Sequence, residues 1–304
     1  MIDPDKKLST VYSKVETRDD DDSGRSSWSE VASSAYSSEV ELIEEKKWPT
    51  SFYTQMKVLS QRNFTEARSR MLSKLNWVQT LGLGCICGSI WFQIPREESK
   101  IADIRGWMFF STTYWMLFSL FGALISCELP LVMTLPTIFH IISYPMMGCY
   151  SAQTFFSLWG FLLLSTVVAQ SVGLFVGAAC KDLQVAVTVS ALYSLSTMLF
   201  GGYYTSSLPH WLQWLQYGSM VHYAFQNMQM IEFGGGPPIR CAESNSLFEV
   251  CRQSNTTTFI PLNQIINHQG ISLPIWANTL ILLLFLIVFR FMGYGVLRYA
   301  RRPK

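Results

Sequence analysis

Few side chains in this sequence have the types and spacing that catalysis requires. The only segment resembling a phosphate loop, 84–88 (GCICG), lacks the lysine with which such loops hold nucleotide phosphates. No HExxH or nucleophile-elbow pattern occurs. The histidines are too widely spaced for a ligand set: His140, His210, His222 and His268. The sequence therefore predicts no enzymatic activity, no metal site and no ATP site within this chain.

Other polar residues indicate an oxidising compartment. Cys241 and Cys251 flank a short polar segment and could close a disulfide. Asn255 begins an Asn-Thr-Thr glycosylation acceptor sequence. Such triplets also occur by chance, and Asn63 begins a second one. The remaining cysteines are expected to pack as small apolar residues in or near helices: Cys85, Cys87, Cys127, Cys149 and Cys180.

The elements that must position these residues are apolar segments. Hydrophobic residues make up 49% of the chain and charged residues 14%, against about 25% charged in soluble domains. The net charge of +2 gives no indication of a nucleic-acid partner. A helix crosses a bilayer with about 20 apolar residues. Stretches long enough to do so are Asn76–Ile94, Trp107–Cys149, Thr154–Ala179, Leu183–Tyr204 and Pro274–Leu297.

The basic residues predict the orientation of these spans. They crowd before the first span and again after the last, at 298–304, so both termini are expected in the cytoplasm and the number of spans is even. Trp107–Cys149 is too long for one span and is interrupted by Glu128 and Pro130. Reading it as two short spans gives six. Arg290, late in the last span, is expected to extend toward the membrane surface.

The N-terminal region differs in composition from the rest of the chain. Residues 1–47 contain four consecutive aspartates and a serine-rich stretch, with too few apolar residues for a core, which predicts a disordered linker. That linker is either a phosphorylatable regulatory segment or a plain tether. Residues 48–74 alternate apolar and basic residues at near-helical spacing. This pattern favours an amphipathic helix at the membrane surface over a soluble linker helix.

The predicted fold is therefore an all-α membrane protein. Residues 75–304 form a domain of six transmembrane helices, with residues 206–273 as a large external loop between helices five and six. This placement puts Cys241, Cys251 and Asn255 outside the cell, where disulfides and glycans are made.

Several segments resemble one family in order along the chain. Residues 198–204 (MLFGGYY), 211–217 (WLQWLQY) and 232–233 (EF) resemble the end of the fifth span and the re-entrant external helices of G-subfamily ATP-binding-cassette half-transporters. These are the white, sterol and breast-cancer-resistance type proteins. Residues 105–110 (RGWMFF), 135–139 (LPTIF) and 170–174 (QSVGL) resemble the second, third and fourth spans. The likeness covers roughly residues 48–304.

The resemblance implies an ABC-2 type exporter membrane domain that works as a homo- or heterodimer in the plasma membrane. ATP and Mg would act through a nucleotide-binding domain that this sequence does not contain. Substrates would be lipophilic, such as sterols, lipids or xenobiotics, held between the second and fifth helices of two halves. By position, the cavity residues would be Phe110, Tyr114, Leu117 and Met198. Tyr203 and Tyr204 would occupy the gate below the external vestibule.

The sequence departs from the family at residues 121–131. In the family a charged coupling helix follows the second span, whereas here FGALISC runs almost directly into ELPL. The coupling segment looks excised. Two alternatives to an exporter half therefore stay open. One is a non-transporting subunit that pairs with full-length half-transporters and inhibits or traffics them. The other is a passive permease served by a separate nucleotide-binding chain.

Overall fold

The computed structural model describes residues 51–71, 73–125, 133–148, 151–204, 211–242, 246–253, 259–271 and 273–299. The expected disordered linker, Glu128, Pro130 and Asn255 lie outside these ranges. The chain divides into two units, residues 1–59 and 60–304, and the description below concerns the second. The helix α3, Phe52–Met71, lies within the segment expected at the membrane surface, and its interfacial position stays a prediction.

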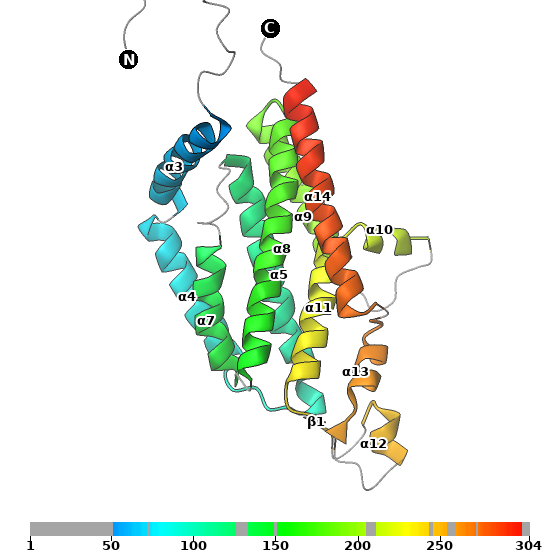
Figure 1. Ribbon diagram of the computed structural model, residues 1–304. Helices are drawn as coiled ribbons and strands as arrows, with labels where there is room; N and C mark the ends of the chain where they lie inside the picture. Colours follow the sequence, from blue (N-terminus) through cyan, green and yellow to red (C-terminus); the bar gives the residue numbers. More distant parts are fainter. Residues whose placement is uncertain are drawn as a thin grey trace, which may run out of the picture. The chain divides into compact units, whose positions relative to one another are not determined.

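A helix occupies each of the six apolar segments (Figure 1). In chain order these are α4 (Lys74–Ile90), α5 (Ile101–Ile125), α7 (Thr134–Gly148), α8 (Ala152–Ala179), α9 (Leu183–Leu199) and α14 (Ile275–Tyr299). α8 is central, because it packs against α5, α14, α11 and α9, while α4 packs mainly against α7. Within the described residues, three helical segments are long and apolar enough to cross a membrane: Glu98–Leu124, Ala152–Ala179 and Ile275–Tyr299.

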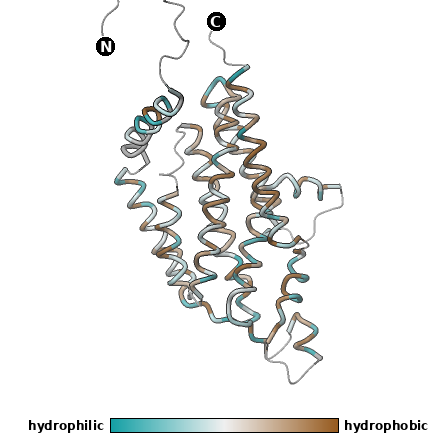
Figure 2. The backbone as a smooth tube through the Cα atoms, viewed as in Figure 1, coloured by the Kyte–Doolittle hydropathy of each residue, from teal (hydrophilic) through white to brown (hydrophobic). Residues whose placement is uncertain are grey.

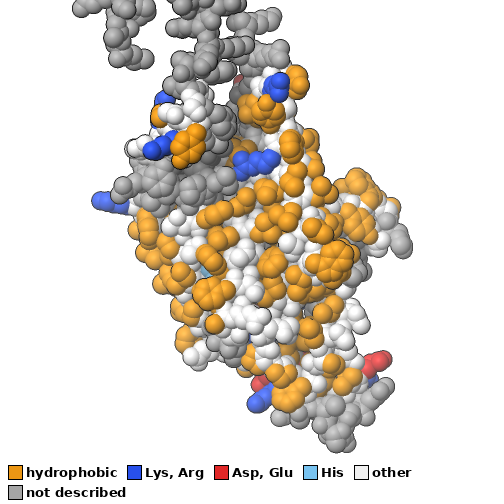
Figure 3. Space-filling view, in the orientation of Figure 1, with side chains coloured by type: hydrophobic (Ala, Val, Ile, Leu, Met, Phe, Trp, Pro, Cys, Tyr) orange, Lys and Arg blue, Asp and Glu red, His pale blue; other side chains and the backbone are white. Residues whose placement is uncertain are grey.

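The apolar surface of the bundle is large. Only 11% of the most apolar window of α14 is buried inside the protein, so most of its hydrophobic side chains face outward. Hydrophobic residues run along α14 in Figure 2, and they are spread over the visible face of the bundle in Figure 3. In water such a surface would be unfavourable. It suits contact with lipid or with another membrane-embedded chain.

The segment Trp107–Cys149 divides unequally. α5 begins six residues before Trp107 and has 25 residues, whereas α7 has 15 and rises only about 22 Å. The charged residues that suggested a later start for α5 are accommodated. Asp103 accepts a hydrogen bond from Lys100, and Arg105 donates to the carbonyl of Gly202. α7 ends at Gly148, whose φ of 120° suits a helix terminus.

The segment expected as one external loop is in part a core helix. α11, Met220–Gly235, packs against α8, α14 and α5. Its apolar residues are almost completely buried, including Met220, Phe225 and Met228. The Ser219 side chain caps the helix by accepting a hydrogen bond from the backbone N–H of His222. The sequence predicts this stretch only as part of the external segment, whereas its buried face places it in the core of the bundle.

Apart from α11, the described part of that segment contains the short helix α10 (Gln213–Tyr217), which packs on α11, and a small unit elsewhere at this end of the chain. That unit contains β1 (Ile239–Arg240), α12 (Glu249–Gln253), β2 (Phe259–Ile260) and α13 (Leu262–His268) (Figure 1). β1 and β2 pair antiparallel, with Ile239 opposite Ile260. Glu98, in the short helix η1 (Glu98–Lys100), accepts hydrogen bonds from the backbone of Ala242 and Leu247 and from the Ser246 hydroxyl. One carboxylate thus ties this unit to the start of α5.

Candidate functional site

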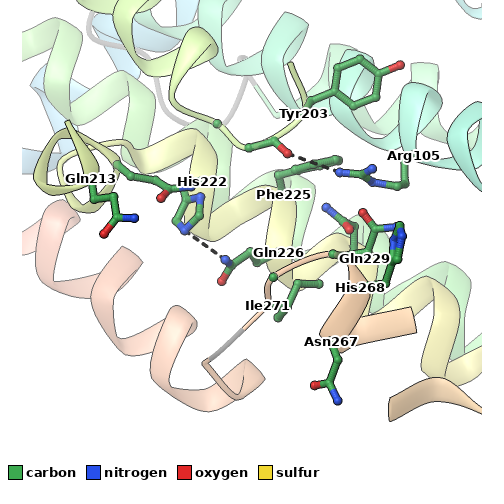
Figure 4. A pocket seen from close by; sticks show the side chains of 15 residues that line it. Arg105, Tyr203, Gln213, His222, Phe225, Gln226, Gln229, Asn267, His268 and Ile271 are labelled. Carbon is green, nitrogen blue, oxygen red and sulfur yellow. Dashed lines mark hydrogen bonds between the residues drawn. The ribbon is translucent and has the colours of Figure 1, made fainter. Parts of the chain in front are cut away.

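A polar pocket lies at the end of the bundle where α5 begins and α9 ends (Figure 4). Its volume is about 570 Å³, within the usual range for small-molecule sites. The lining comes from Arg105 of α5, the turn after α9, two glutamines at α10, one face of α11 and the segment 267–271. None of the fifteen described lining residues is an aspartate or a glutamate.

Arg105 is held against the pocket by three contacts. Its Nη2 atom donates to the Gly202 carbonyl at 3.3 Å, and its guanidinium carbon lies 5.8 Å from the ring centres of both Tyr203 and Phe225. Gly202 has a φ of +90°, a conformation that glycine adopts without strain, and this turn presents the carbonyl to Arg105. A cation beside aromatic faces is electrostatically favoured.

α11 supplies one wall of the pocket. His222, Phe225, Gln226 and Gln229 recur at the spacing of a single helix face. Gln226 Nε2 contacts His222 Nε2 at 3.0 Å, and Gln226 Oε1 accepts from Asn278 Nδ2 of α14 at 3.1 Å. The sequence gives His222 no ligand role, and the structure places it on this wall of the pocket. The helical repeat of polar side chains was the signal that could have identified this wall.

Tyr203 and Tyr204, the expected gate residues, lie beside Phe109, which the sequence did not single out. Phe109 stacks on Tyr203 with ring centres 4.7 Å apart and meets Tyr204 edge-on at 5.4 Å. Phe109 also contacts Phe225 of α11. Tyr203 lines the polar pocket, whereas Tyr204 is exposed. These aromatic rings form the boundary between the pocket and the end of α9.

Two of the four expected cavity residues point elsewhere. Phe110, Tyr114 and Phe118 stack at successive turns of α5, with ring centres 5.8 and 6.4 Å apart, and we call them the aromatic ladder. The ladder packs on the core cluster that includes Trp115 and residues of α4, α7 and α8. Tyr114 accepts a hydrogen bond from Gln79 of α4 at 2.9 Å.

The other two expected cavity residues, Leu117 and Met198, do not belong to the aromatic ladder. Leu117 is half-buried on α5, and Met198 packs against the main core cluster near the end of α9. None of the four lines the polar pocket. In the family that the sequence resembles, the substrate cavity lies between two halves, so one chain cannot enclose it. Their role in substrate binding stays a prediction.

A buried ion pair lies one turn beyond the pocket residue Gln229 on α11. Glu232 of α11 is completely buried and pairs with Arg96, and its other oxygen accepts from the Tyr144 hydroxyl at 2.9 Å. Arg96 also donates to the Glu232 backbone carbonyl. The network joins α11 to α7 and to the segment between α4 and α5. Arg290, which lies in α14, was expected to extend toward the membrane surface. Its Nε atom donates a hydrogen bond to Ser171 Oγ of α8 at 3.0 Å.

The structure brings Cys241 and Cys251 together in a disulfide. The bond links the segment after β1 to α12, in the same unit that Glu98 holds. Cys87 is buried in the cluster beneath the aromatic ladder, Cys85 is exposed and Cys180 is half-buried. Among the described residues there is no group of three or more His, Cys, Asp and Glu side chains that could hold a metal ion.

Comparison with known proteins agrees with this architecture. The ABC-2 type transporter family matches residues 54–127 and 117–233, more than half of the chain. The two matched segments overlap at 117–127. The chain therefore belongs to the ABC-2 type transporter family, a family of membrane domains.

Its relatives are G-family ATP-binding-cassette transporters. The chain is 29% identical over 216 residues to ABC transporter G family member 21 of Arabidopsis thaliana, covering 62% of this chain and 32% of the relative. It is 28% identical to member 26 of the same species, covering 67% and 35%. It is 26% identical to the broad substrate specificity transporter ABCG2 of Sus scrofa, covering 83% and 43%. The chain thus spans well under half the length of these relatives.

Proposed function

We propose that this chain forms the membrane-spanning domain of a G-type half-transporter that exports lipophilic molecules when it is dimerised and coupled to nucleotide-binding domains. The proposal rests on the match to the ABC-2 type transporter family, together with the presence of a helix in each of the six apolar segments. The chain itself supplies the membrane path. ATP hydrolysis would come from nucleotide-binding domains elsewhere in the assembly.

The outer surface of α9 supports a partner half. Its exposed hydrophobic side chains include Leu192, Leu195 and Leu199, each at least half exposed. In a dimer of this family the fifth helix faces the other half, so α9 and α5 would together border the substrate cavity. Leu117, Met198, Phe110 and Tyr114 would then contribute apolar and aromatic surface with few fixed polar demands, which suits lipophilic ligands.

The orientation follows from charge. Basic residues flank the first and last helices, and the disulfide unit lies in the segment between α9 and α14. We infer that both termini are cytoplasmic, that residues 206–273 face outward and that the plasma membrane is the site of action. Glycosylation of Asn255 would accompany this orientation.

The test is co-expression with a full-length G-family half-transporter. The tagged chain is purified, and the co-purified pair is reconstituted in liposomes. The proposal predicts ATP-dependent movement of a rhodamine dye or a fluorescent sterol by the pair. The control pair carries a hydrolysis-deficient partner and should move neither probe. Transport without any effect of ATP would contradict the proposal.

One observation favours a second candidate function. The family match breaks into two pieces that overlap at residues 117–127, where the sequence lacks the coupling segment expected after the second span. Without that segment, nucleotide-driven motion would reach the membrane helices poorly. The chain would then be a non-transporting subunit that inhibits its partner. In the same reconstitution, this function predicts that added chain lowers the partner's ATPase activity and dye transport together.

A further inference from the structure

The polar pocket contains a positive charge, Arg105, that forms no ion pair with any residue that the structure describes. Within the described part of the chain, no carboxylate lies within ion-pair distance of Arg105, and no acidic residue lines the pocket. We propose that the pocket binds a small organic acid through its carboxylate group, with Arg105 as the principal contact.

The geometry of Arg105 supports an anionic ligand. Gly202 and the rings of Tyr203 and Phe225 orient the guanidinium, but they supply no negative charge. Its Nε atom is buried and has no hydrogen-bond partner among the described residues. A desolvated charge is costly unless it is paired. The flat guanidinium fork matches a carboxylate, which can accept two parallel hydrogen bonds from it.

The nearest carboxylate of the neighbouring unit cannot take this role. Glu98 is already the acceptor for two backbone N–H groups and the Ser246 hydroxyl. Glu232, one turn beyond Gln229 on α11, pairs with Arg96 and Tyr144. These two acidic groups are therefore occupied, Asp103 of α5 accepts from Lys100, and no described carboxylate forms an ion pair with Arg105.

The remaining lining indicates a ligand with polar groups beyond its carboxylate. Gln229 is 2% exposed, and its Oε1 atom is buried without a hydrogen-bond partner. Such an acceptor is costly to leave unpaired, and a donor on the ligand would satisfy it. Gln213 and Gln216 add amides on the opposite side, and Phe225 offers one apolar face. A small acid with a ring and a hydroxyl or amide group fits this lining (Figure 4).

This pocket differs from the lipophilic cavity of the proposed function. It lies within a single chain, and Phe110, Tyr114, Leu117 and Met198 do not line it. Binding there requires neither a second half nor ATP, so the inference does not rest on transport. If the orientation proposed above holds, the pocket opens on the external side, next to the gate tyrosine Tyr203.

The experiment measures binding by ¹⁹F NMR with the full chain in phosphatidylcholine nanodiscs. The probes are 4-fluorobenzoate, 4-fluorophenylacetate and 4-fluorosalicylate, each matched with its neutral amide. We expect at least one acid to show line broadening that unlabelled acid displaces, and the amides to show none. Inorganic phosphate should displace the bound acid far less well than acetate does at equal concentration.

Variants locate the site. Arg105→Gln should weaken binding of the acid at least about tenfold, because a charge-assisted contact is lost. Arg105→Lys should retain part of the binding, since the charge stays but the fork is lost. Arg290→Gln removes a guanidinium that bonds Ser171 outside the pocket. This variant should bind the acid as tightly as the unmodified chain does. Thermal unfolding of each variant reports whether the fold is retained.

Four results would overturn the inference. One is the absence of displaceable binding for every acid in the panel. The second is equal broadening of acids and amides, which would show a site without charge selectivity. The third is displacement by phosphate as readily as by acetate, which would make the site a general anion site. Unchanged affinity in a folded Arg105→Gln variant would remove Arg105 from the site.

Discussion

The two faces of α5 differ in chemistry although they share one helix. One face carries Arg105 and Phe109, which border the polar pocket together with Tyr203. The other carries the aromatic ladder, which packs on a cluster of α4, α7 and α8 residues. Adjacent residues on a helix point about 100° apart, so Phe109 and Phe110 serve different regions. The two neighbouring aromatic residues therefore lie in different surroundings within one chain.

The pocket side is stabilised by polar contacts, and its most sensitive point is Glu232. We expect Glu232→Ala to lower the free energy of unfolding by about 3–5 kcal/mol, because the buried ion pair with Arg96 and the hydrogen bond from Tyr144 would both be lost. Unfolding in mixed micelles with a denaturing detergent measures the change. The exposed pair of Lys100 and Asp103 is the control, and Lys100→Ala should cost about 0–1 kcal/mol. Equal losses would mean that burial of the pair is unimportant.

Substitution by alanine at Phe109 and at Phe110 tests the difference between the two faces of α5. Phe109 is 4% exposed and contacts Tyr203, Tyr204 and Phe225, so Phe109→Ala should cost about 3 kcal/mol through the cavity it leaves. Phe110→Ala should cost at most half as much, because that side chain is only half-buried.

The same pair separates the two faces by ligand binding. Phe109→Ala should weaken binding of the fluorinated acids to the pocket, whereas Phe110→Ala should leave it unchanged. The measurement is the ¹⁹F displacement titration on each folded variant. If Phe110→Ala weakened binding as strongly as Phe109→Ala, the two faces would not be independent.

Removal of the disulfide should loosen the small unit of β1, α12, β2 and α13 and leave the packing of the aromatic ladder unchanged. Replacing Cys241 and Cys251 by serine together should cost about 2 kcal/mol, because the unfolded outer segment gains freedom. Hydrogen exchange read by mass spectrometry should show faster exchange in residues 239–253 and unchanged exchange in α5 beside the ladder. Serine at exposed Cys85 is the control and should alter neither. Accelerated exchange throughout α5 would show that the two regions unfold together.

The smallest expected effect is on the ladder side. Gln79→Leu removes the hydrogen bond to the Tyr114 hydroxyl and should cost about 0.6 kcal/mol, a typical value between membrane helices. Gln79 lies near the surface of the bundle, so leucine adds no buried strain. A Gln79→Glu variant replaces the donating amide with a carboxylate of the same shape, to which the Tyr114 hydroxyl would have to donate, and serves as the comparison. A loss of several kcal/mol for Gln79→Leu would indicate that the ladder depends on polar contacts as the pocket side does.

The fold could be predicted from this sequence to the extent that it follows hydrophobic length. A helix lies in each predicted apolar segment, and α5 and α7 lie on either side of the predicted interruption. Among the described residues, three helical segments are long and apolar enough to cross a membrane, and six spans stay a prediction. α5 begins at Ile101, six residues before the predicted apolar stretch, and the polar residues Asp103 and Arg105 near its start bond to Lys100 and Gly202. The burial of α11 depends on long-range packing, which residue patterns do not encode.

The candidate site was harder to predict than the fold. The pocket joins residues more than 160 positions apart in the chain, from Arg105 to Ile271, and no spacing rule connects them. The pairing of Cys241 with Cys251 was the simplest prediction, since the two cysteines lie ten residues apart in one polar segment. The ladder residues were chosen by resemblance to a dimeric family, and one chain cannot show the surface that a second half completes.

Mapping of N-linked glycans tests the proposed membrane orientation most directly, because the chain carries one acceptor asparagine on each expected side. Asn255 lies in the segment expected outside, and Asn63 lies before the first span on the expected cytoplasmic side. Expressed in secretory membranes, the chain should carry a glycan that peptide N-glycosidase removes, lost in Asn255→Gln and retained in Asn63→Gln. A glycan on Asn63, with Asn255 unmodified, would contradict the orientation and with it the assignment of residues 206–273 to the exterior.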